Sequence, residues 1–247
     1  MLCTLCCSLY APKGDVNRVT RTLDWYENIC KSAGVDFTLC LVDDNSPESF
    51  DRIKDRFKPQ GYCKDVQYFE SEERLGKAKQ LNRLFPVVKT PFICMIDNDL
   101  VLPQNWLQDC IRVATIPMVG ICGVHVESHL QPGMEHRQPT PNGDIVFHTP
   151  EMLGGACIVW SKQKLGEENY LWTESPEYGH EDAEFVQRIH RRVGMVTVIP
   201  SRGAHFLPVE GDEVAKSYSK WKDAKLDINM HKIKERIIHL DETKTLH

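Results

Sequence analysis

A run of strand-like apolar residues at 92–96 ends abruptly in two carboxylates, Asp97 and Asp99, which are separated by one residue. In an open α/β sheet, ligands bind at the carboxyl ends of the strands. Two carboxylates so close together repel each other unless a cation or a donor-rich ligand lies between them. The segment therefore predicts either a ligand site at the end of a buried strand or a surface turn with two solvated aspartates. A divalent metal that holds a nucleotide diphosphate fits the first interpretation, because hard cations prefer oxygen ligands.

The composition is that of one large globular domain. The chain has 247 residues, of which 41% are hydrophobic, and this is enough for a packed core. The net charge of −5 argues against a nucleic-acid binder that is basic as a whole. No apolar run reaches membrane-spanning length, and the first residues resemble a strand rather than a signal peptide. We therefore expect a cytoplasmic protein without a transmembrane segment.

The ten cysteines do not form a metal-binding or disulfide pattern. Four of them, Cys40, Cys94, Cys122 and Cys157, lie inside apolar strand-like runs, where cysteine behaves as a small hydrophobe. The pair Cys3 and Cys6 has CxxC spacing, but on a strand this spacing places the two side chains on opposite faces. We expect reduced thiols, as in a cytosolic protein.

The first half of the chain alternates between strand and helix patterns. Ser46 and Pro47 suit the N-cap and first position of a helix. Strands separated by helices imply crossover connections and a mostly parallel sheet with both faces covered. The predicted strands are 2–9, 37–42, 66–70, 92–97 and 119–126, and the predicted helices are 16–30, 47–57, 76–88 and 104–114.

The pattern changes in the second half. Residues 127–150 are rich in Pro, His, Gly and Gln and predict a loop or loose hairpin, and 153–160 is an apolar run after two glycines. A helix is predicted at 181–192 and a strand at 195–199. A long polar helical stretch follows at 213–240.

Further polar groups stand at the ends of predicted elements. Asp43 and Asp44 follow the predicted strand 37–42, at the same edge of the sheet as Asp97. A carboxylate there can accept hydrogen bonds from a pyrimidine base or from ribose. The alternative is that the two residues form an Asx-type turn. Arg74 and Lys79 flank a helix start, which attracts anions, or they belong to a solvated basic face.

Three more candidates lie late in the chain. Glu181 and Asp182 begin a predicted helix. Acidic residues at this position complement the helix dipole. The alternative is that one of the two acts as a general base on an acceptor hydroxyl. His205 follows the last strand and is either a structural residue or a metal ligand beside aspartate oxygens.

Taken together, these segments resemble the family 2-type glycosyltransferases with the GT-A fold, over roughly residues 3–206. That resemblance implies an α/β fold: a Rossmann-like, mostly parallel central sheet flanked by helices, with a C-terminal helical extension. It also implies a glycosyltransferase domain at 1–210, divided into a nucleotide-binding half (1–100) and an acceptor half (101–210), before an extension at 211–247. The matching segments are 41–46, 76–82, 97–99 (the DxD motif), 154–157 and 179–182.

The resemblance implies a role for each matching residue. Asp43 or Asp44 would contact the nucleotide base and Asp97 the ribose. Asp99 would bind Mn²⁺ or Mg²⁺ bridging the diphosphate, and His205 looks like a late metal-binding histidine. Asp182 would be the general base of an inverting displacement, with Glu181 positioning the acceptor. Gly154 and Gly155 would let the backbone approach the sugar closely.

The sequence also departs from the family pattern. The helix at 76–82 has Gln80-Leu81-Asn82 where Ala-Arg-Asn is common, so Arg74, with Lys79, substitutes for a phosphate-binding arginine. No membrane segment follows, which disfavours a processive membrane synthase.

The expected activity is a metal-dependent, inverting transfer of a sugar from a nucleotide-sugar, a UDP-sugar in the first instance, to an acceptor hydroxyl. The acceptor is a glycan, a small molecule or a modified base in nucleic acid. The nucleic-acid acceptor is suggested by the polar stretch 213–240, which carries many lysines with interleaved aromatic residues. A solvated amphipathic helix is the alternative interpretation of this stretch, and the favoured one. Two alternatives remain open, a nucleotidyltransferase and a non-catalytic nucleotide-sugar-binding module.

Overall fold

The structure is a computed structural model of the 247-residue chain. It describes residues 2–126, 133–140, 143–150, 153–166, 171–174, 181–200 and 203–208, and four isolated positions between 213 and 220. The predicted C-terminal extension at 211–247 therefore lies almost entirely outside the described residues. Within the described part, no helix has both the length and the apolar character needed to cross a bilayer.

The elements alternate as the sequence predicts. The helices are α1 (Val16–Ser32), α2 (Lys77–Leu84), α3 (Trp106–Ala114), α4 (Lys162–Leu165) and α6 (Glu181–Arg192). The strands are β1 (Cys3–Leu9), β2 (Phe37–Asp43), β3 (Cys63–Glu70), β4 (Phe92–Ile96), β5 (Leu100–Val101), β6 (Val119–Val124), β7 (Met134–Gln138), β8 (Ile145–Thr149), β9 (Cys157–Ser161), β10 (Met195–Ile199) and β11 (His205–Phe206).

Among the described residues, nine strands form one sheet in the order β3-β2-β1-β4-β9-β6-β10-β8-β7, and β5 and β11 form a separate antiparallel ribbon. The strands β3, β2, β1 and β4 are mutually parallel, and β10 is parallel to β6. Only β9 and β8 run against the others, because both pair antiparallel with their neighbours. The predicted mostly parallel α/β sheet is confirmed.

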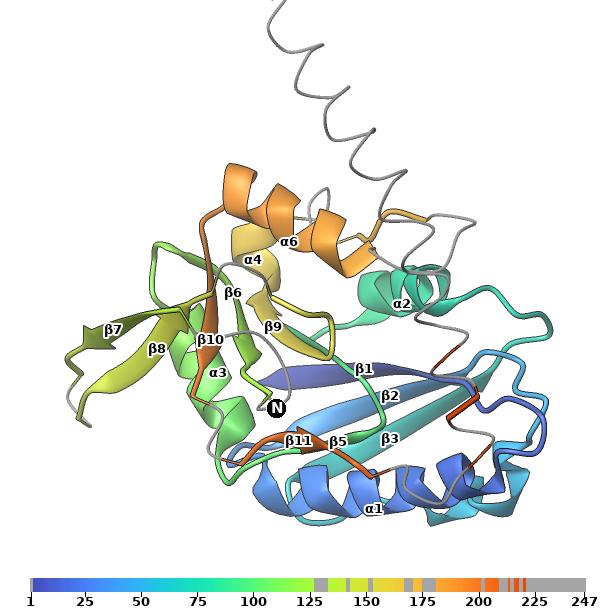
Figure 1. The fold of residues 1–247 in the computed structure, drawn as a ribbon. Coiled ribbons are helices and arrows are strands. Elements are labelled where there is room, and N and C mark those ends of the chain that lie inside the picture. Colours follow the sequence, from blue (N-terminus) through green and yellow to red (C-terminus); the bar gives the residue numbers. More distant parts are fainter. Residues whose placement is uncertain are drawn as a thin grey trace, which may run out of the picture.

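Helices cover both faces of the sheet (Figure 1). One core packs α1 and α3 against the odd-numbered residues of β1, including Cys3 and Leu5. The second core packs α2, α4 and α6 against the opposite face, which includes Cys6. Cys3 and Cys6 thus lie in different cores, as the period of two along a strand predicts. All ten cysteines are buried free thiols.

The structure corrects one predicted helix. Residues 47–57 form two short 3₁₀ turns, Phe50–Arg52 and Lys54–Arg56, instead of a continuous helix. Ser46 does not cap them, because its hydroxyl donates to Asp43 and accepts a hydrogen bond from the Ala11 amide. Ser49 caps the first turn instead, through the amide of Asp51.

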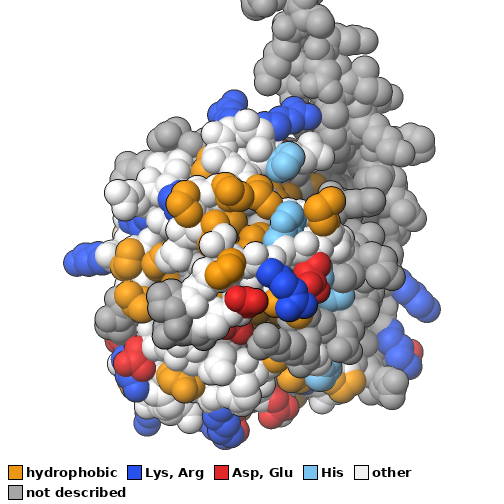
Figure 2. Space-filling model, turned by 90° about the vertical axis from the view of Figure 1, so that its left-hand side faces the viewer, with side chains coloured by type: hydrophobic (Ala, Val, Ile, Leu, Met, Phe, Trp, Pro, Cys, Tyr) orange, Lys and Arg blue, Asp and Glu red, His pale blue; other side chains and the backbone are white. Residues whose placement is uncertain are grey.

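Of the two structures predicted for 127–150, a loop or a loose hairpin, the described residues form the hairpin. The strands β7 and β8 pair antiparallel and extend the sheet beyond β10. Figure 2 looks onto this end of the molecule and shows hydrophobic and histidine side chains gathered there. Within the hairpin, the ring of His136 stacks on Phe147 of the opposite strand. Each strand is only five residues long and lacks strong alternation, so its pattern resembles that of a loop.

Candidate functional site

The candidate site lies at the edge of the sheet where the parallel strands end. The strand β2 ends at Asp43, and Asp97 follows β4 directly. Because β9 runs antiparallel to β4, its N-terminal end reaches the same edge. Gly155 and Ala156 precede β9, and the Ala156 carbonyl accepts a 2.8 Å hydrogen bond from the Asp97 amide. The sheet topology thus brings residues from distant parts of the sequence together.

Lys77 links Asp97 to the segment that leads into β9. Its Nζ donates a 2.6 Å hydrogen bond to Asp97 Oδ1 and a 2.9 Å hydrogen bond to the Gly155 carbonyl. Lys77 is the first residue of α2 and follows Gly76, whose φ of 84° is a conformation that favours glycine. The Lys77 ammonium therefore compensates the charge of Asp97 in this structure.

Asp182 meets the same segment from α6. Its Oδ2 accepts a 2.8 Å hydrogen bond from the Gly155 amide, and its Oδ1 accepts one from the Ala183 amide. A Cβ at Gly155 would lie 2.6 Å from the Asp182 Cβ, so a side chain at this position would displace Asp182. Gly154, in contrast, has open space around its Cβ direction. The two glycines therefore serve different purposes, and close contact with Asp182 is what requires Gly155.

Asp44 is fully engaged inside the protein. Its side chain accepts hydrogen bonds from the amides of Leu75 and Gly76 at 2.8 and 2.9 Å, and a 2.7 Å bond from Gln80 Nε2. Asp44 and Gln80 are 2 and 1% exposed. Asp44 therefore anchors the start of α2 and, with it, the position of Lys77.

Asp43 has a more open environment than its neighbour. Its Oδ1 accepts hydrogen bonds from the Ser46 amide and hydroxyl, at 3.0 and 2.5 Å. Burial raises the pKa of Asp43 above its usual value, and the two bonds from Ser46 oppose that rise. The Asp43 side chain thus closes a turn to Ser46, which is close to the Asx-type turn considered from the sequence.

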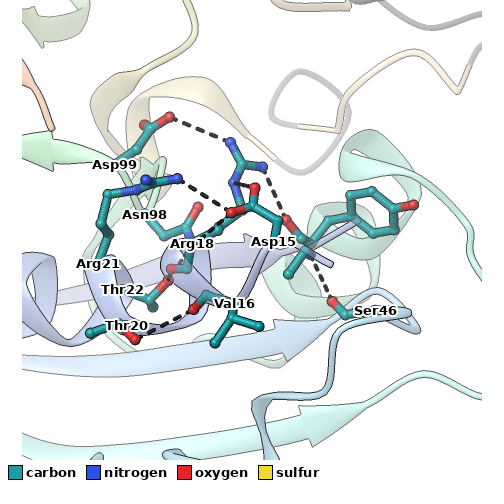
Figure 3. Close-up of polar contacts among 11 residues, drawn as sticks. Asp15, Val16, Arg18, Thr20, Arg21, Thr22, Ser46, Asn98 and Asp99 are labelled. Atoms are coloured by element: carbon teal, nitrogen blue, oxygen red, sulfur yellow. Dashed lines mark hydrogen bonds and ion pairs between the residues drawn. The ribbon is translucent and has the colours of Figure 1, made fainter. Parts of the chain in front are cut away.

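Asp99 lies beside two arginines of α1 (Figure 3). An Arg18 guanidinium nitrogen is 4.0 Å from Asp99 Oδ2, and Arg18 also donates to the Tyr10 carbonyl at 3.0 Å. The buried N-cap residue Asp15 holds both Arg18 and Arg21 through ion pairs of 3.7 and 3.5 Å. Between the two predicted ligand-binding carboxylates, Asn98 turns inward and donates to Thr22 at 2.8 Å. Asp97 and Asp99 thus meet different cations, Lys77 and Arg18.

The β5–β11 ribbon brings His205 close to Asp99 in register. His205 is paired with Val101, and the Leu207 amide donates to the Asp99 carbonyl at 2.6 Å. This bond continues the pairing of the ribbon by one residue, so Asp99 precedes Val101, the partner of His205, by two positions. His205 is exposed, and its Nδ1 contacts the Gly203 carbonyl at 2.7 Å. Among the described residues, however, no group of three or more His, Cys, Asp or Glu is arranged to hold a metal ion.

The other predicted site residues lie at the margin of this cluster. The Arg74 side chain is exposed and its guanidinium stacks 3.8 Å above the Tyr10 ring centroid. Lys79 is half-buried on α2. Glu181 begins α6 as predicted, but its side chain lies outside what the structure describes.

Sequence reasoning missed four residues of the cluster: Lys77, Gln80, Arg18 and Trp172. The Lys77 Nζ lies 5.6 Å from the centroid of the Trp172 ring, which is buried. Lys77 belongs to a segment that the sequence singles out, and its place directly after Gly76 marks it as the first residue of the helix. The contacts of Arg18 and Trp172 have no comparable local signal, because their partners are distant in sequence.

Comparison with known proteins gives a family match. Residues 17–162, more than half of the chain, match the sequence profile described as Glycosyl transferase family 2. A search of curated protein sequences found no match.

Several solved structures share the fold. The S. aureus protein TarS in complex with UDP-GlcNAc is 14% identical, with a TM-score of 0.66 over 87% of this chain and 61% of that chain. The mannosyltransferase PcManGT from Pyrobaculum calidifontis, in complex with GDP-Man and Mn²⁺, is 15% identical, with a TM-score of 0.60 over 85 and 58% of the two chains. GalNAc-T7 with UDP, GalNAc and Mn²⁺ is 12% identical, with a TM-score of 0.59 over 84 and 44%. The chain spans 37 to 61% of the length of such structures.

Proposed function

The chain belongs to glycosyltransferase family 2, and from this premise we propose that it transfers a sugar from a nucleotide-sugar to an acceptor hydroxyl with inversion at the anomeric carbon. The observation that carries the proposal is that Gly155 bonds both to Asp182 and to Lys77, the lysine that pairs with Asp97. Asp97 follows β4 at the strand edge that we assign to the nucleotide, and Asp182 lies in the first turn of α6. This arrangement supports separate roles in donor binding and in proton transfer.

The donor is proposed to bind across the ends of β1, β2 and β4. Asp97 accepts hydrogen bonds from the ribose, and either Asp43 or Asp44 contacts the base. Asp44 already accepts three hydrogen bonds within the protein. Its contribution to donor binding therefore includes holding the backbone of Leu75 and Gly76 in place. The basic residues Arg74 and Lys79 supply positive charge for the diphosphate. We propose a UDP-sugar as the first donor to test, in line with the complexes of TarS and GalNAc-T7.

The residues near Asp99 fit a divalent cation by their chemistry. Asp99 offers carboxylate oxygens, its side chain is 34% exposed, and His205 offers an imidazole from the strand that pairs with β5. Hard cations such as Mg²⁺ and Mn²⁺ accept a few protein ligands and complete their shell with substrate phosphates. We propose that Asp99 and His205 hold Mn²⁺ or Mg²⁺. A bound cation would neutralise charge on the leaving diphosphate.

Asp182 is the proposed general base. It takes the proton of the acceptor hydroxyl while that oxygen forms a bond to the anomeric carbon. The bond from the anomeric carbon to the diphosphate oxygen breaks on the opposite face, and the nucleoside diphosphate leaves. Glu181 is proposed to position the acceptor. A glycan, a small molecule and a modified base in nucleic acid are the acceptor classes to test.

The first experiment follows release of the nucleoside diphosphate from UDP-, GDP- and dTDP-sugars, with Mn²⁺ and with EDTA. We expect turnover of one donor. EDTA should abolish this turnover and Asp99→Ala should reduce it. The product should have the inverted anomeric configuration, as determined by NMR. Asp182→Asn should abolish transfer while leaving donor binding by calorimetry nearly intact. Asp24→Asn, an exposed position on α1, is the matched control. Absence of binding to every nucleotide-sugar would overturn the proposal.

A further inference from the structure

We propose that Lys77 is a positioning residue that orients Asp182 for proton transfer, acting through the backbone of Gly155. The inference rests on the proposed function, because it gives a reason for the geometry of the base. It adds a link between the donor side of the site and the acceptor side, which lie on different elements. Three residues from α2, from the segment before β9 and from α6 form this link.

The Lys77 side chain is held on several sides. Its Nζ donates to Asp97 Oδ1 at 2.6 Å and to the Gly155 carbonyl at 2.9 Å, and the Trp172 ring centroid lies 5.6 Å away. The Lys77 side chain is 26% exposed, so water competes only partly for these contacts. Charge-assisted hydrogen bonds are stronger than neutral ones, and a cation within about 6 Å of an indole ring is attracted to it. Lys77 therefore fixes the position of the Gly155 carbonyl.

The position of Gly155 in turn determines the position of Asp182. The Gly155 amide donates to Asp182 Oδ2 at 2.8 Å, and the two residues are so close that a Cβ on Gly155 would lie 2.6 Å from the Asp182 Cβ. The Gly155 amide thus fixes the position of one carboxylate oxygen of Asp182, and the Ala183 amide at the start of α6 fixes the position of the other. A small displacement of Gly155 would rotate the carboxylate or push it away from the acceptor.

The segment keeps a second attachment when the ammonium is removed. The Ala156 carbonyl accepts a 2.8 Å hydrogen bond from the Asp97 amide, in continuation of the β4–β9 pairing. Loss of the Lys77 ammonium should therefore leave the sheet intact while Gly155 and the Asp97 carboxylate lose a shared partner. The effect should appear in the orientation of the base rather than in the fold.

The test compares Lys77→Met and Lys77→Arg with Lys89→Met, an exposed lysine outside the cluster. The measurements are the melting temperature, the donor Kd by calorimetry, and kcat and kcat/KM across pH with saturating donor. For Lys77→Met we expect kcat to fall on the order of 10- to 100-fold, as for a misplaced general base, with a changed acidic limb of the pH profile. Lys77→Arg should restore part of the rate, and Lys89→Met should match the wild type.

A double-mutant cycle with Gly155→Ala tests the link itself. Because a methyl group at Gly155 displaces Asp182 directly, Lys77→Met should add much less than its own factor in the Gly155→Ala background. If the two effects multiply independently, or if Lys77→Met raises only the donor Kd with an unchanged kcat and pH profile, the inference is wrong. A wild-type protein that binds no nucleotide-sugar would instead overturn the proposed function, so the two failures are distinguishable.

Discussion

Asp44 Oδ1 accepts a 2.7 Å hydrogen bond from Gln80 Nε2, and both side chains are buried from solvent. The pair joins the turn after β2 to the first helical turn of α2. Asp44 also receives the amides of Leu75 and Gly76, so a single carboxylate satisfies three donors. A buried carboxylate is stable in the protein only with such compensation. The relationship therefore explains how the start of α2, and with it Lys77, is held at the edge of the sheet.

Asp44→Asn should destabilise the protein strongly. The amide group of asparagine places an NH₂ opposite donors that the carboxylate now satisfies, so at least one buried donor loses its partner. We expect a loss of about 2–4 kcal/mol in the free energy of unfolding, measured with urea. Asp43→Asn is the matched control, because both Ser46 bonds go to Asp43 Oδ1, which asparagine retains as an acceptor. Equal effects of the two substitutions would contradict this account of Asp44.

The stability contributed by Asp43 should depend on pH. Burial raises the pKa of Asp43 in the folded protein, so ionisation costs more in the folded state than in the unfolded chain. This penalty is present above the folded-state pKa and disappears as the pH falls below the unfolded value of about 3.9. The wild type should therefore gain stability relative to Asp43→Asn as the pH is lowered from 7 towards 4. A stability difference that stays constant over this range, or that moves the other way, would refute the prediction.

Lys164 should stabilise the C-terminal end of α3. Its Nζ donates to the carbonyls of Ala114 and Ile116 at 2.5 Å and to that of Val119 at 3.3 Å, and burial lowers its pKa. Ala114 is the last residue of α3, and a cation is favourable at this end of a helix. Lys164→Met should cost about 1–3 kcal/mol of unfolding free energy by urea denaturation. Lys31→Met on the surface of α1 should change it by less than about 0.5 kcal/mol.

The sequence predicted the parts of the site that have a local signal. An apolar strand that ends in Asp97, and a helix that begins at Glu181, are both legible from neighbouring residues, and both elements are confirmed. The family and the fold class are confirmed as well. The roles assigned to the individual site residues remain predictions.

The missing parts depend on pairings between distant residues. The contact between Gly155 and Asp182 arises because β9 enters the sheet antiparallel beside β4, and no local pattern specifies that neighbour. The helix predicted from Ser46 failed for a similar reason, since the Ser46 hydroxyl bonds with Asp43 and with Ala11 of the neighbouring segment. Local capping signals are outweighed where tertiary partners compete for the same hydroxyl.

Arg18 should weaken the affinity of the site for a divalent cation. Its guanidinium lies 4.0 Å from Asp99 Oδ2, so a metal bound by Asp99 meets a neighbouring positive charge. Both side chains are partly exposed, which limits the interaction to about 1 kcal/mol, or roughly a fivefold change in affinity. Arg18→Gln should therefore bind Mn²⁺ more tightly than the wild type, with free Mn²⁺ followed by electron paramagnetic resonance.

Two control variants distinguish the effect of the Arg18 charge beside Asp99 from the effect of the protein's net charge on Mn²⁺ affinity. Arg52→Gln removes the same charge from the protein at a surface site paired with Glu48, and it should leave Mn²⁺ affinity unchanged. Asp99→Ala should remove the difference between Arg18→Gln and the wild type, because the carboxylate through which Arg18 acts is then absent. The difference should also shrink in high salt, since partly exposed charges are screened. Weaker Mn²⁺ binding in Arg18→Gln would mean that Arg18 orders Asp99 for ligation instead of competing with the metal.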